Sequence, residues 1–409
     1  MAVLRVTGLH SKRLPPATKA SKHSAPSSKA TRSSEGSSTS KQTAKKNASG
    51  ATRAYDLRLY DNTMLSDFRR CPRMWFYRHG LGWRPQTPSS ALIFGNAWHN
   101  AMDVVWRLVC WEKQRKDQLV VAEALKAFEA CWEEMDGPLT IEQYEASGYA
   151  AARGPVRTVE TAHEMLIYYT RDRRSVLTDP DFKLLDIERP FAVPIDPANP
   201  DLYYVGRLDK VARVRGKLRI YEHKTTTLGS GSSGFQQRWI ASFSPNTQVE
   251  GYLYAGSMLY GEPIKDVFVD GALVHASEHG MFRFVPVEKQ WQTLDSWLWE
   301  AHYWISQVES NKAAMKRHEE ACDWAASNDP AASPPPRYLA AWPKNTNVCT
   351  DFSGCPYLDV CRVTSDPTQR ALPPGFRVEH WSPFDVLKLE RIFEGNKLVQ
   401  SRGAKKEPR

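Results

Sequence analysis

The sequence predicts one mixed α/β domain that carries a helical insertion, and two observations lead to this class. Apolar residues recur at helical spacing up to about residue 180, and at Phe182 the pattern changes to that of strands. A helical segment then separates the first three strand-like segments from two more. This order is typical of a sheet covered by helices rather than of a helical bundle or an all-β fold.

The helical part begins with "LSDFRRCPRMWFYRHGLGW", for which we expect a helix capped by Ser66. A second helix is predicted for "FGNAWHNAMDVVWRLVC", whose apolar residues follow one face: Trp98, Met102, Val105 and Val109. Residues 118–178 predict two or three further helices. We therefore assign about 63–180 to the helical part of the domain.

The sheet is predicted for about 182–288. Its first three strands are "FKLLDIERPFAVPI", "DLYYVGRLDKVARV" and "KLRIYEHKTTT", and the last two are separated only by Arg215–Gly216. A helix ("PNTQVEGYLYAGSMLYG") and two strands ("VFVDGALVHA", "MFRFVPV") follow. The remaining expectations are a long helix over about 288–325, a cysteine loop over 342–362 and an amphipathic helix over about 382–400.

Residues 1–54 differ in composition from the rest of the chain. They hold eleven of the 55 Lys and Arg residues but only one of the 46 acids, so the net charge of +9 is concentrated there. The segment is rich in Ser and poor in large apolar residues, and we expect it to be disordered. It also resembles an organelle transit peptide, while the alternative is a solvated tail with non-specific affinity for nucleic acid. The expected boundaries are a tail over 1–54, a domain over 55–362 and a C-terminal helix with a basic tail over 363–409.

Two carboxylates are predicted to face each other on the hairpin. If the turn is centred on Arg215–Gly216, Asp209 lies opposite Glu222. Like charges in such a position repel, and a divalent cation between them would turn that repulsion into attraction. Lys224 shares a strand face with Glu222, because side chains alternate along a strand. The alternative is a surface ion-pair cluster without function.

Four motifs in order, "FGNAWHNAMD", "GRLDKV", "YEHK" and "QVEGY", resemble the PD-(D/E)XK nuclease superfamily, specifically its RecB-like branch with CRISPR-associated and phage exonuclease relatives. The resemblance covers about residues 63–362 and implies a restriction-endonuclease-like mixed sheet flanked by helices. It also implies that the catalytic residues are Asp209, Glu222, Lys224, Gln248 and Tyr252. The implied ligands for Mg²⁺ or Mn²⁺ are His99, Asp209, Glu222 and the backbone carbonyl of His223.

Some of these residues also have ordinary structural interpretations. His99 would be a core histidine paired with Asp103, and Gln248 with Tyr252 would be a surface pair at i and i+4. Glu188, on the strand before the hairpin, is an extra acid near the expected site.

The cysteines suggest a second metal site. Three of the seven lie within thirteen residues, Cys349, Cys355 and Cys361, and their spacing is not that of common zinc folds. Cys71 is the natural fourth ligand and Cys322 the reserve, while Cys110 and Cys131 are expected in the core. The RecB-like resemblance implies an iron–sulfur cluster, of the 4Fe-4S type, as a staple of the C-terminal segment, with zinc or no metal as the alternatives. The five-residue gap after Cys349 departs from the usual pattern of that branch.

Together these features predict a metal-dependent DNA exonuclease that acts on duplex ends or single strands in recombination, repair or phage replication. The alternatives are a non-catalytic nucleic-acid-binding or assembly module and an oxidoreductase. No phosphate-binding loop occurs in the sequence, so a helicase or recombination partner would be a separate protein. No apolar run is long enough to span a membrane, and mean hydropathy is −0.53. We expect a phage or bacterial cytoplasm, or an organelle if residues 1–54 include a transit peptide.

Overall fold

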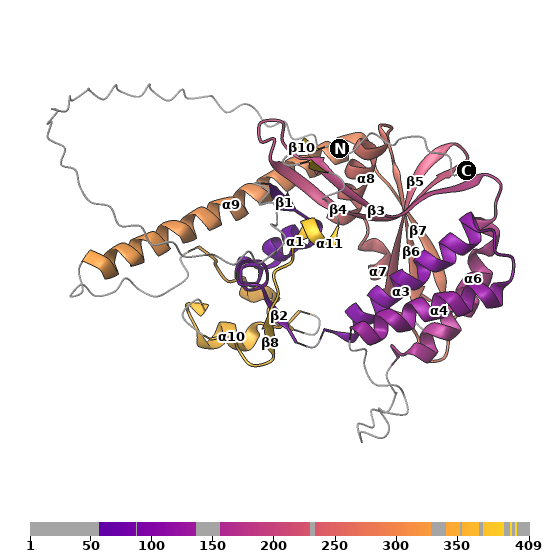
Figure 1. Ribbon diagram of the computed structural model, residues 1–409, viewed down its shortest axis with the longest axis horizontal. Coiled ribbons are helices and arrows are strands. Elements are labelled where there is room, and N and C mark those ends of the chain that lie inside the picture. Colours follow the sequence, from indigo (N-terminus) through magenta and orange to yellow (C-terminus); the bar gives the residue numbers. More distant parts are fainter. Residues whose placement is uncertain are drawn as a thin grey trace, which may run out of the picture. The chain divides into compact units, whose positions relative to one another are not determined.

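A six-stranded mixed sheet lies at the centre of the computed structural model (Figure 1). The structure describes residues 57–86, 88–135, 156–229, 234–328, 341–351, 354–367, 371–387, 393–394 and 397–398. The strands run in the order β1-β4-β5-β6-β7, and β3 pairs with β4 along its other edge. Their bounds are β1 (Arg58–Tyr60), β3 (Phe182–Pro194), β4 (Leu202–Val214), β5 (Lys217–Thr226), β6 (Asp266–Leu273) and β7 (Phe282–Glu288). The mixed α/β class is confirmed.

The hairpin between β4 and β5 has the expected register. Val214 pairs with Lys217, and the ladder continues to Lys210 and Tyr221. Arg215 and Gly216 both have positive φ, 48° and 78°, as a tight two-residue turn between twisted strands requires. Glycine adopts this conformation freely, whereas Arg215 adopts it at some steric cost.

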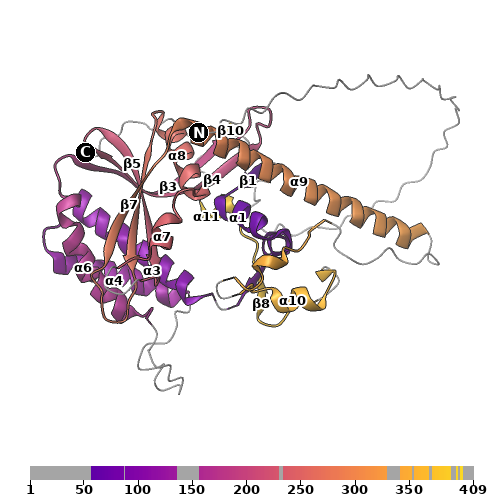
Figure 2. The same cartoon turned by 180° about the vertical axis from the view of Figure 1, so that it is seen from behind.

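Helices cover both faces of the sheet (Figures 1 and 2). One face carries α3 (Ser90–Trp106), α4 (Asp117–Glu134) and α6 (Val159–Leu177), with the π-helical turn η2 (Arg107–Trp111) after α3. The side chains that predict α3 are fully buried here, Trp98, Met102 and Val105 among them. Cys110 and Cys131 belong to the same core, as expected.

The other face carries α7 (Gln237–Ala241) and α8 (Thr247–Tyr260), and α8 packs against the long helix α9 (Trp291–Asn328). Helix α8 begins where the Asn246 side chain accepts hydrogen bonds from the amides of Gln248 and Val249. A Cβ at Gly251 would lie 2.5 Å from Tyr204 Oη, so only glycine lets α8 approach the sheet this closely. This approach places the α8 side chains against β4 and β5.

The first expected helix is two helices. The segment contains α1 (Asn62–Arg70), α2 (Pro72–Trp75) and the π-helical turn η1 (Phe76–Gly80). Between α1 and α2 the backbone of Cys71 is extended (φ −161°, ψ 112°), because the following Pro72 disfavours the helical conformation there. The cap is Asp61, not Ser66, and its side chain accepts from the Met64 amide at 2.7 Å.

The expected helix over 382–400 is not a single helix. Among the described residues of this range, α11 (Pro383–Val386) is helical, and the short strands β9 (Phe393–Glu394) and β10 (Lys397–Leu398) pair antiparallel. The other C-terminal elements are η4 (Thr346–Val348), α10 (Leu358–Val363) and β8 (Phe376–Val378), which pairs with β2 (Trp83–Pro85). Strands of two or three residues are too short to show a period in sequence.

In the part of the chain that the structure describes, no helix is both long and apolar enough to cross a bilayer. The expected disordered tail over 1–54, with its possible transit peptide, lies outside the described residues.

Candidate active site

The site is built where β4 separates from β5. Their ladder ends at Lys210 and Tyr221, and the next residue of β4 is Asp209. The Asp209 side chain continues the contact, because its Oδ2 accepts a hydrogen bond of 2.9 Å from the backbone amide of His223. Asp209 is only 6% exposed. A carboxylate therefore substitutes for a backbone acceptor at the edge of the paired region.

Glu222 and Lys224 lie on the face of β5 that carries Leu218 and Ile220, as the strand alternation predicts. The Lys224 ammonium donates to Glu222 Oε1 at 2.5 Å. Glu222 is 2% exposed, and its second oxygen, Oε2, has no hydrogen-bond partner among the described residues. Burial and the charge of Asp209 raise the pKa of Glu222 to about 8. A buried acceptor of this kind fits a cation ligand.

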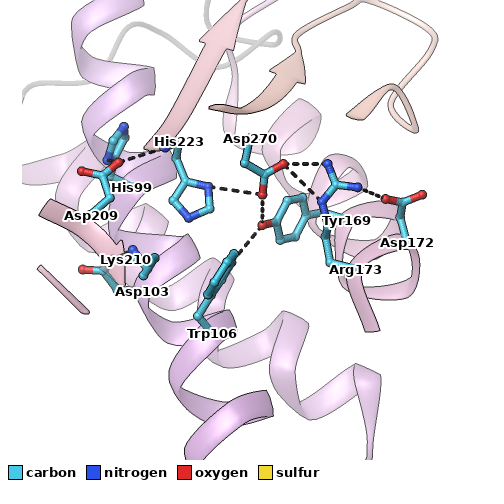
Figure 3. Close-up of polar contacts among 10 residues, drawn as sticks. All are labelled: His99, Asp103, Trp106, Tyr169, Asp172, Arg173, Asp209, Lys210, His223 and Asp270. Carbon is cyan, nitrogen blue, oxygen red and sulfur yellow. Dashed lines mark hydrogen bonds and ion pairs between the residues drawn. The ribbon is translucent and has the colours of Figure 1, made fainter. Parts of the chain in front are cut away.

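His99 reaches Asp209 from helix α3. Its Nδ1 lies 3.2 Å from Asp209 Oδ2. Asp103, which we considered as the partner of a core histidine, instead binds the fully buried Lys210 at 2.5 Å (Figure 3). Burial lowers the pKa of His99 although Asp209 opposes this effect, so the imidazole is neutral at pH 7 and has a lone pair for a metal.

The pKa of Asp209 shifts the other way from that of Glu222. Burial would raise it, but His99, Lys210, Lys224 and the His223 amide together hold it below the ordinary value. Asp209 is therefore ionised near neutral pH, and it lies within electrostatic reach of both lysines.

Glu188 on β3 also belongs to the site. Ligand atoms of His99, Glu188 and Asp209 all lie within 4.8 Å of one another. Glu222 is not in this close group, and its Oε1 pairs with the Lys224 ammonium. One oxygen of Glu188 pairs with Arg207. Burial and the charge of Asp209 raise the pKa of Glu188 to about 8.

Gln248 and Tyr252 enter the site from α8. The Gln248 side-chain amide donates to Tyr252 Oη at 3.0 Å. Burial and the charges of Glu222 and Asp209 raise the pKa of Tyr252 well above its ordinary value, so the phenol stays protonated and lies within reach of the acids. The two residues are not a solvent-exposed pair, because Tyr252 is 8% exposed.

The opposite face of β5 is supported by a buried polar network (Figure 3). The His223 side chain is fully buried, and its Nδ1 lies 3.5 Å from Asp270 Oδ2 on β6. Asp270 accepts hydrogen bonds from Tyr169 at 2.6 Å and from Arg173 at 2.6 and 3.2 Å, both on α6. Trp106 of α3 donates to the Tyr169 hydroxyl at 2.9 Å. The strand that carries Glu222 and Lys224 is thereby connected to the two helices behind it.

Sequence reasoning missed this network and the buried Lys210. A signal existed, since Asp270 is the one charged residue in the apolar run "VFVDGALV", and a buried acid requires a partner. The sequence does not indicate that this partner is Arg173, because Arg173 is 97 residues away in the chain.

The residues present fit a divalent cation. The carboxylates of Glu188 and Asp209 and the His99 imidazole offer ligand atoms within 4.8 Å of one another. The pKa values of Glu188 and Glu222 are raised, and Glu222 Oε2 has no partner among the described residues. Oxygen donors suit Mg²⁺, and the added imidazole suits Mn²⁺ as well.

The four candidate cysteines come together at the break between α1 and α2. The Asn345 amide contacts Cys71 Sγ at 3.4 Å, and the Cys355 amide donates to the Cys349 carbonyl at 2.8 Å. Burial raises the pKa of the Cys355 thiol, the Tyr357 amide opposes this, and the other three thiols raise it further. Cys322 is on α9, where its thiol lies 3.7 Å from His318 Nε2.

Carboxylates and a lysine where two interior strands separate, with a histidine from a covering helix, are the side chains that a hydrolase with a divalent cation would use. A model of the PD-(D/E)XK nuclease superfamily matches residues 62–362, more than half of the chain. The chain therefore belongs to the PD-(D/E)XK nuclease superfamily: it is a nuclease, of a family that uses divalent metals on nucleic acids.

Among solved structures, the chain is similar to the 2.19 Å crystal structure of a protein from Eubacterium rectale that is provisionally described as an exonuclease. The two are 14% identical, the match covers 80% of this chain and 91% of that one, and the TM-score is 0.36. No curated protein matches the sequence.

Proposed function

We propose that this nuclease is a Mg²⁺- or Mn²⁺-dependent DNA exonuclease that hydrolyses phosphodiester bonds at duplex ends or in single strands. The observation that carries the proposal is that His99, Asp209, Glu222 and Lys224 meet where the interior strands β4 and β5 separate. The unpartnered Glu222 Oε2 supports it, because a buried acid in that state requires a cation or a proton.

Each residue then has a role in hydrolysis. Asp209, Glu222, His99 and the His223 carbonyl would hold the cation. When bound, it supplies an acidified water and offsets phosphate charge. Burial opposes the charge on Lys224, but Glu222 and Asp209 outweigh burial and raise its pKa. Lys224 therefore stays protonated and would stabilise the negative charge that develops on the phosphate. Gln248 and Tyr252 would position the attacking water or the DNA backbone.

The cysteines support a finer assignment to the RecB-like branch, with an iron–sulfur cluster of the 4Fe-4S type on Cys71, Cys349, Cys355 and Cys361. The other three thiols lie near enough to Cys355 to raise its pKa, and four thiolates suit an iron–sulfur cluster as well as zinc. Anaerobic purification with iron analysis tests this: iron with a broad visible absorption band is expected, and zinc alone would contradict it.

The biological setting that we propose is recombination, repair or phage replication in a phage or bacterial cytoplasm. A separate helicase or recombination protein would unwind the substrate, because the sequence has no phosphate-binding loop.

The test is degradation of end-labelled single- and double-stranded DNA with Mg²⁺, Mn²⁺ or EDTA. Glu222→Ala and Lys224→Ala should each lower the rate roughly 10²-fold or more, because each removes a group that acts on the transition state. Lys217→Ala is the matched control, since Lys217 is exposed at the far end of the same strand.

DNA binding by the two inactive variants should persist. Undiminished cutting by both would contradict the assigned site. Binding without cutting by the wild-type protein, in any metal, would favour a non-catalytic binding module. The product ladder gives the polarity and distinguishes exonuclease from endonuclease action.

A further inference from the structure

We propose that Glu188 is a direct ligand of the catalytic cation, together with His99 and Asp209, an assignment that rests on the proposed nuclease function. The three residues come from separate elements, β3, α3 and β4, yet offer ligand atoms that all lie within 4.8 Å of one another. Only this triad has such spacing among the described His, Cys, Asp and Glu residues. Two carboxylates and an imidazole form a mixed donor set that suits Mn²⁺ as well as Mg²⁺.

The strand register directs Glu188 to this position. The pairs on either side, Ile187 with Lys210 and Arg189 with Leu208, bracket Glu188 and Asp209, so the two residues lie level with each other on neighbouring strands. The Glu188 side chain is 19% exposed and that of Asp209 is 9% exposed. Both carboxylates are therefore largely removed from water, and they repel each other when both are ionised unless a cation lies between them.

The backbone of Glu188 is strained, which an ordinary structural residue would not require. Its φ is +51° within a thirteen-residue strand, a conformation that is costly for any residue with a Cβ. Glycine or asparagine would fit there with less strain, yet the chain places a glutamate. Strain of this kind is retained where the surrounding structure and a functional side chain demand it.

The ion pair with Arg207 does not explain the position by itself. Arg207 is 50% exposed, so its pair with Glu188 contributes little to stability. The nearest buried cation, Lys210, already binds Asp103 at 2.5 Å. Arg207 contacts one Glu188 oxygen, and the carboxylate has further lone pairs that a cation would use.

The test measures Mn²⁺ affinity of the full-length protein by electron paramagnetic resonance and calorimetry, without nucleic acid. Glu188→Gln should weaken the Kd at least tenfold. Glu188→Gly should weaken it equally while leaving the Tm of the metal-free protein unchanged or higher, because glycine relaxes the positive φ and a repelling charge is lost. Glu262→Gln is the matched control, since Glu262 also pairs with an arginine, Arg213, away from the site.

The results separate two failures. Wild-type Kd values in both Glu188 variants, with binding lost in Asp209→Asn, would overturn the role of Glu188 and leave the proposed function intact. A lower Tm with an unchanged Kd would show that Glu188 serves only its ion pair with Arg207. Absence of Mn²⁺ binding by the wild-type protein would contradict the proposed function itself.

Discussion

At the scale of single residues, the site contains more carboxylates than the neighbouring positively charged side chains balance. Asp209 interacts with two lysines and a histidine and stays ionised, whereas burial and the charge of Asp209 raise the pKa of both Glu188 and Glu222 to about 8. These two acids are protonated in much of the metal-free protein at pH 7. Cation binding requires their ionised forms, so metal affinity should rise with pH and protons should be released on binding.

The raised pKa values predict the pH dependence of stability. Because the folded carboxyls of Glu188 and Glu222 keep protons that the unfolded chain has lost, the folded state binds more protons between about pH 4.5 and about pH 8. The free energy of unfolding of the metal-free protein should therefore decrease as the pH rises through this window. Urea titrations at several pH values in EDTA measure this free energy of unfolding.

The control for this prediction is the double variant Glu188→Gln and Glu222→Gln, which should show a flatter pH profile. Saturating Mn²⁺ at pH 8 should restore stability in the wild-type protein, because the ion binds only the folded state. An equally steep profile in the double variant would assign the effect to other acids.

At the scale of elements, strand β5 has a different role on each face. Glu222 and Lys224 face α8 and the site, while His223 between them faces Asp270, Tyr169 and Arg173 (Figure 3). Arg173 also stacks on Phe284 of β7, with its guanidinium carbon 3.9 Å from the ring centroid. The His223 ring contacts Trp106 of α3 and Tyr169 of α6 edge-on, which packs β5 against α3, the helix that carries His99.

Asp270→Ala should destabilise the protein by about 3–5 kcal/mol, because it leaves the 6% exposed side chain of Arg173 unpaired in the core. Asp172→Ala removes the other acid paired with Arg173, but Asp172 is 49% exposed, and about 0.5 kcal/mol or less is expected. Urea unfolding measures the free energy of unfolding of both variants and of the wild-type protein. Similar losses would show that Arg173 does not depend on Asp270.

At the scale of the whole described chain, the N-terminal helices and the C-terminal segment form one packed unit. Trp342 stacks on Trp75 and Phe76, the buried Arg73 donates to the Trp342 carbonyl at 2.7 Å, and Tyr357 donates to the Trp83 carbonyl at 2.7 Å. The four cysteines lie within this contact. A cluster there would fasten two segments that are far apart in sequence.

The proposed cluster predicts that Cys71→Ser lowers the iron content and increases cleavage of the C-terminal segment in limited proteolysis, because one ligand that would connect the two segments is lost. Cys322→Ser is the control, since Cys322 lies on α9 beside His318, and it should retain iron and protease resistance. Equal iron loss in both variants would point to general unfolding instead of a lost ligand.

The sequence by itself determined the mixed α/β class, the strand order around the hairpin and its register, because alternation and turn chemistry are local properties of the chain. It also predicted which residues meet: His99, Asp209, Glu222, Lys224, Gln248 and Tyr252 do lie together, although their roles stay predictions. Local signals did not reveal the break at Cys71, which depends on a single residue, Pro72, within an otherwise helical pattern. They also did not reveal the short strands β9 and β10.

Only the tertiary structure shows which charged side chains contact each other at and near the site. Asp103 binds Lys210 instead of His99, Glu188 joins His99 and Asp209, and Asp270 binds Arg173. Each of these contacts joins residues between 21 and 110 positions apart in sequence, and charge alone does not select among several acids and bases. Burial selects them, because a charged group removed from water is tolerated only beside the partner that the fold brings to it.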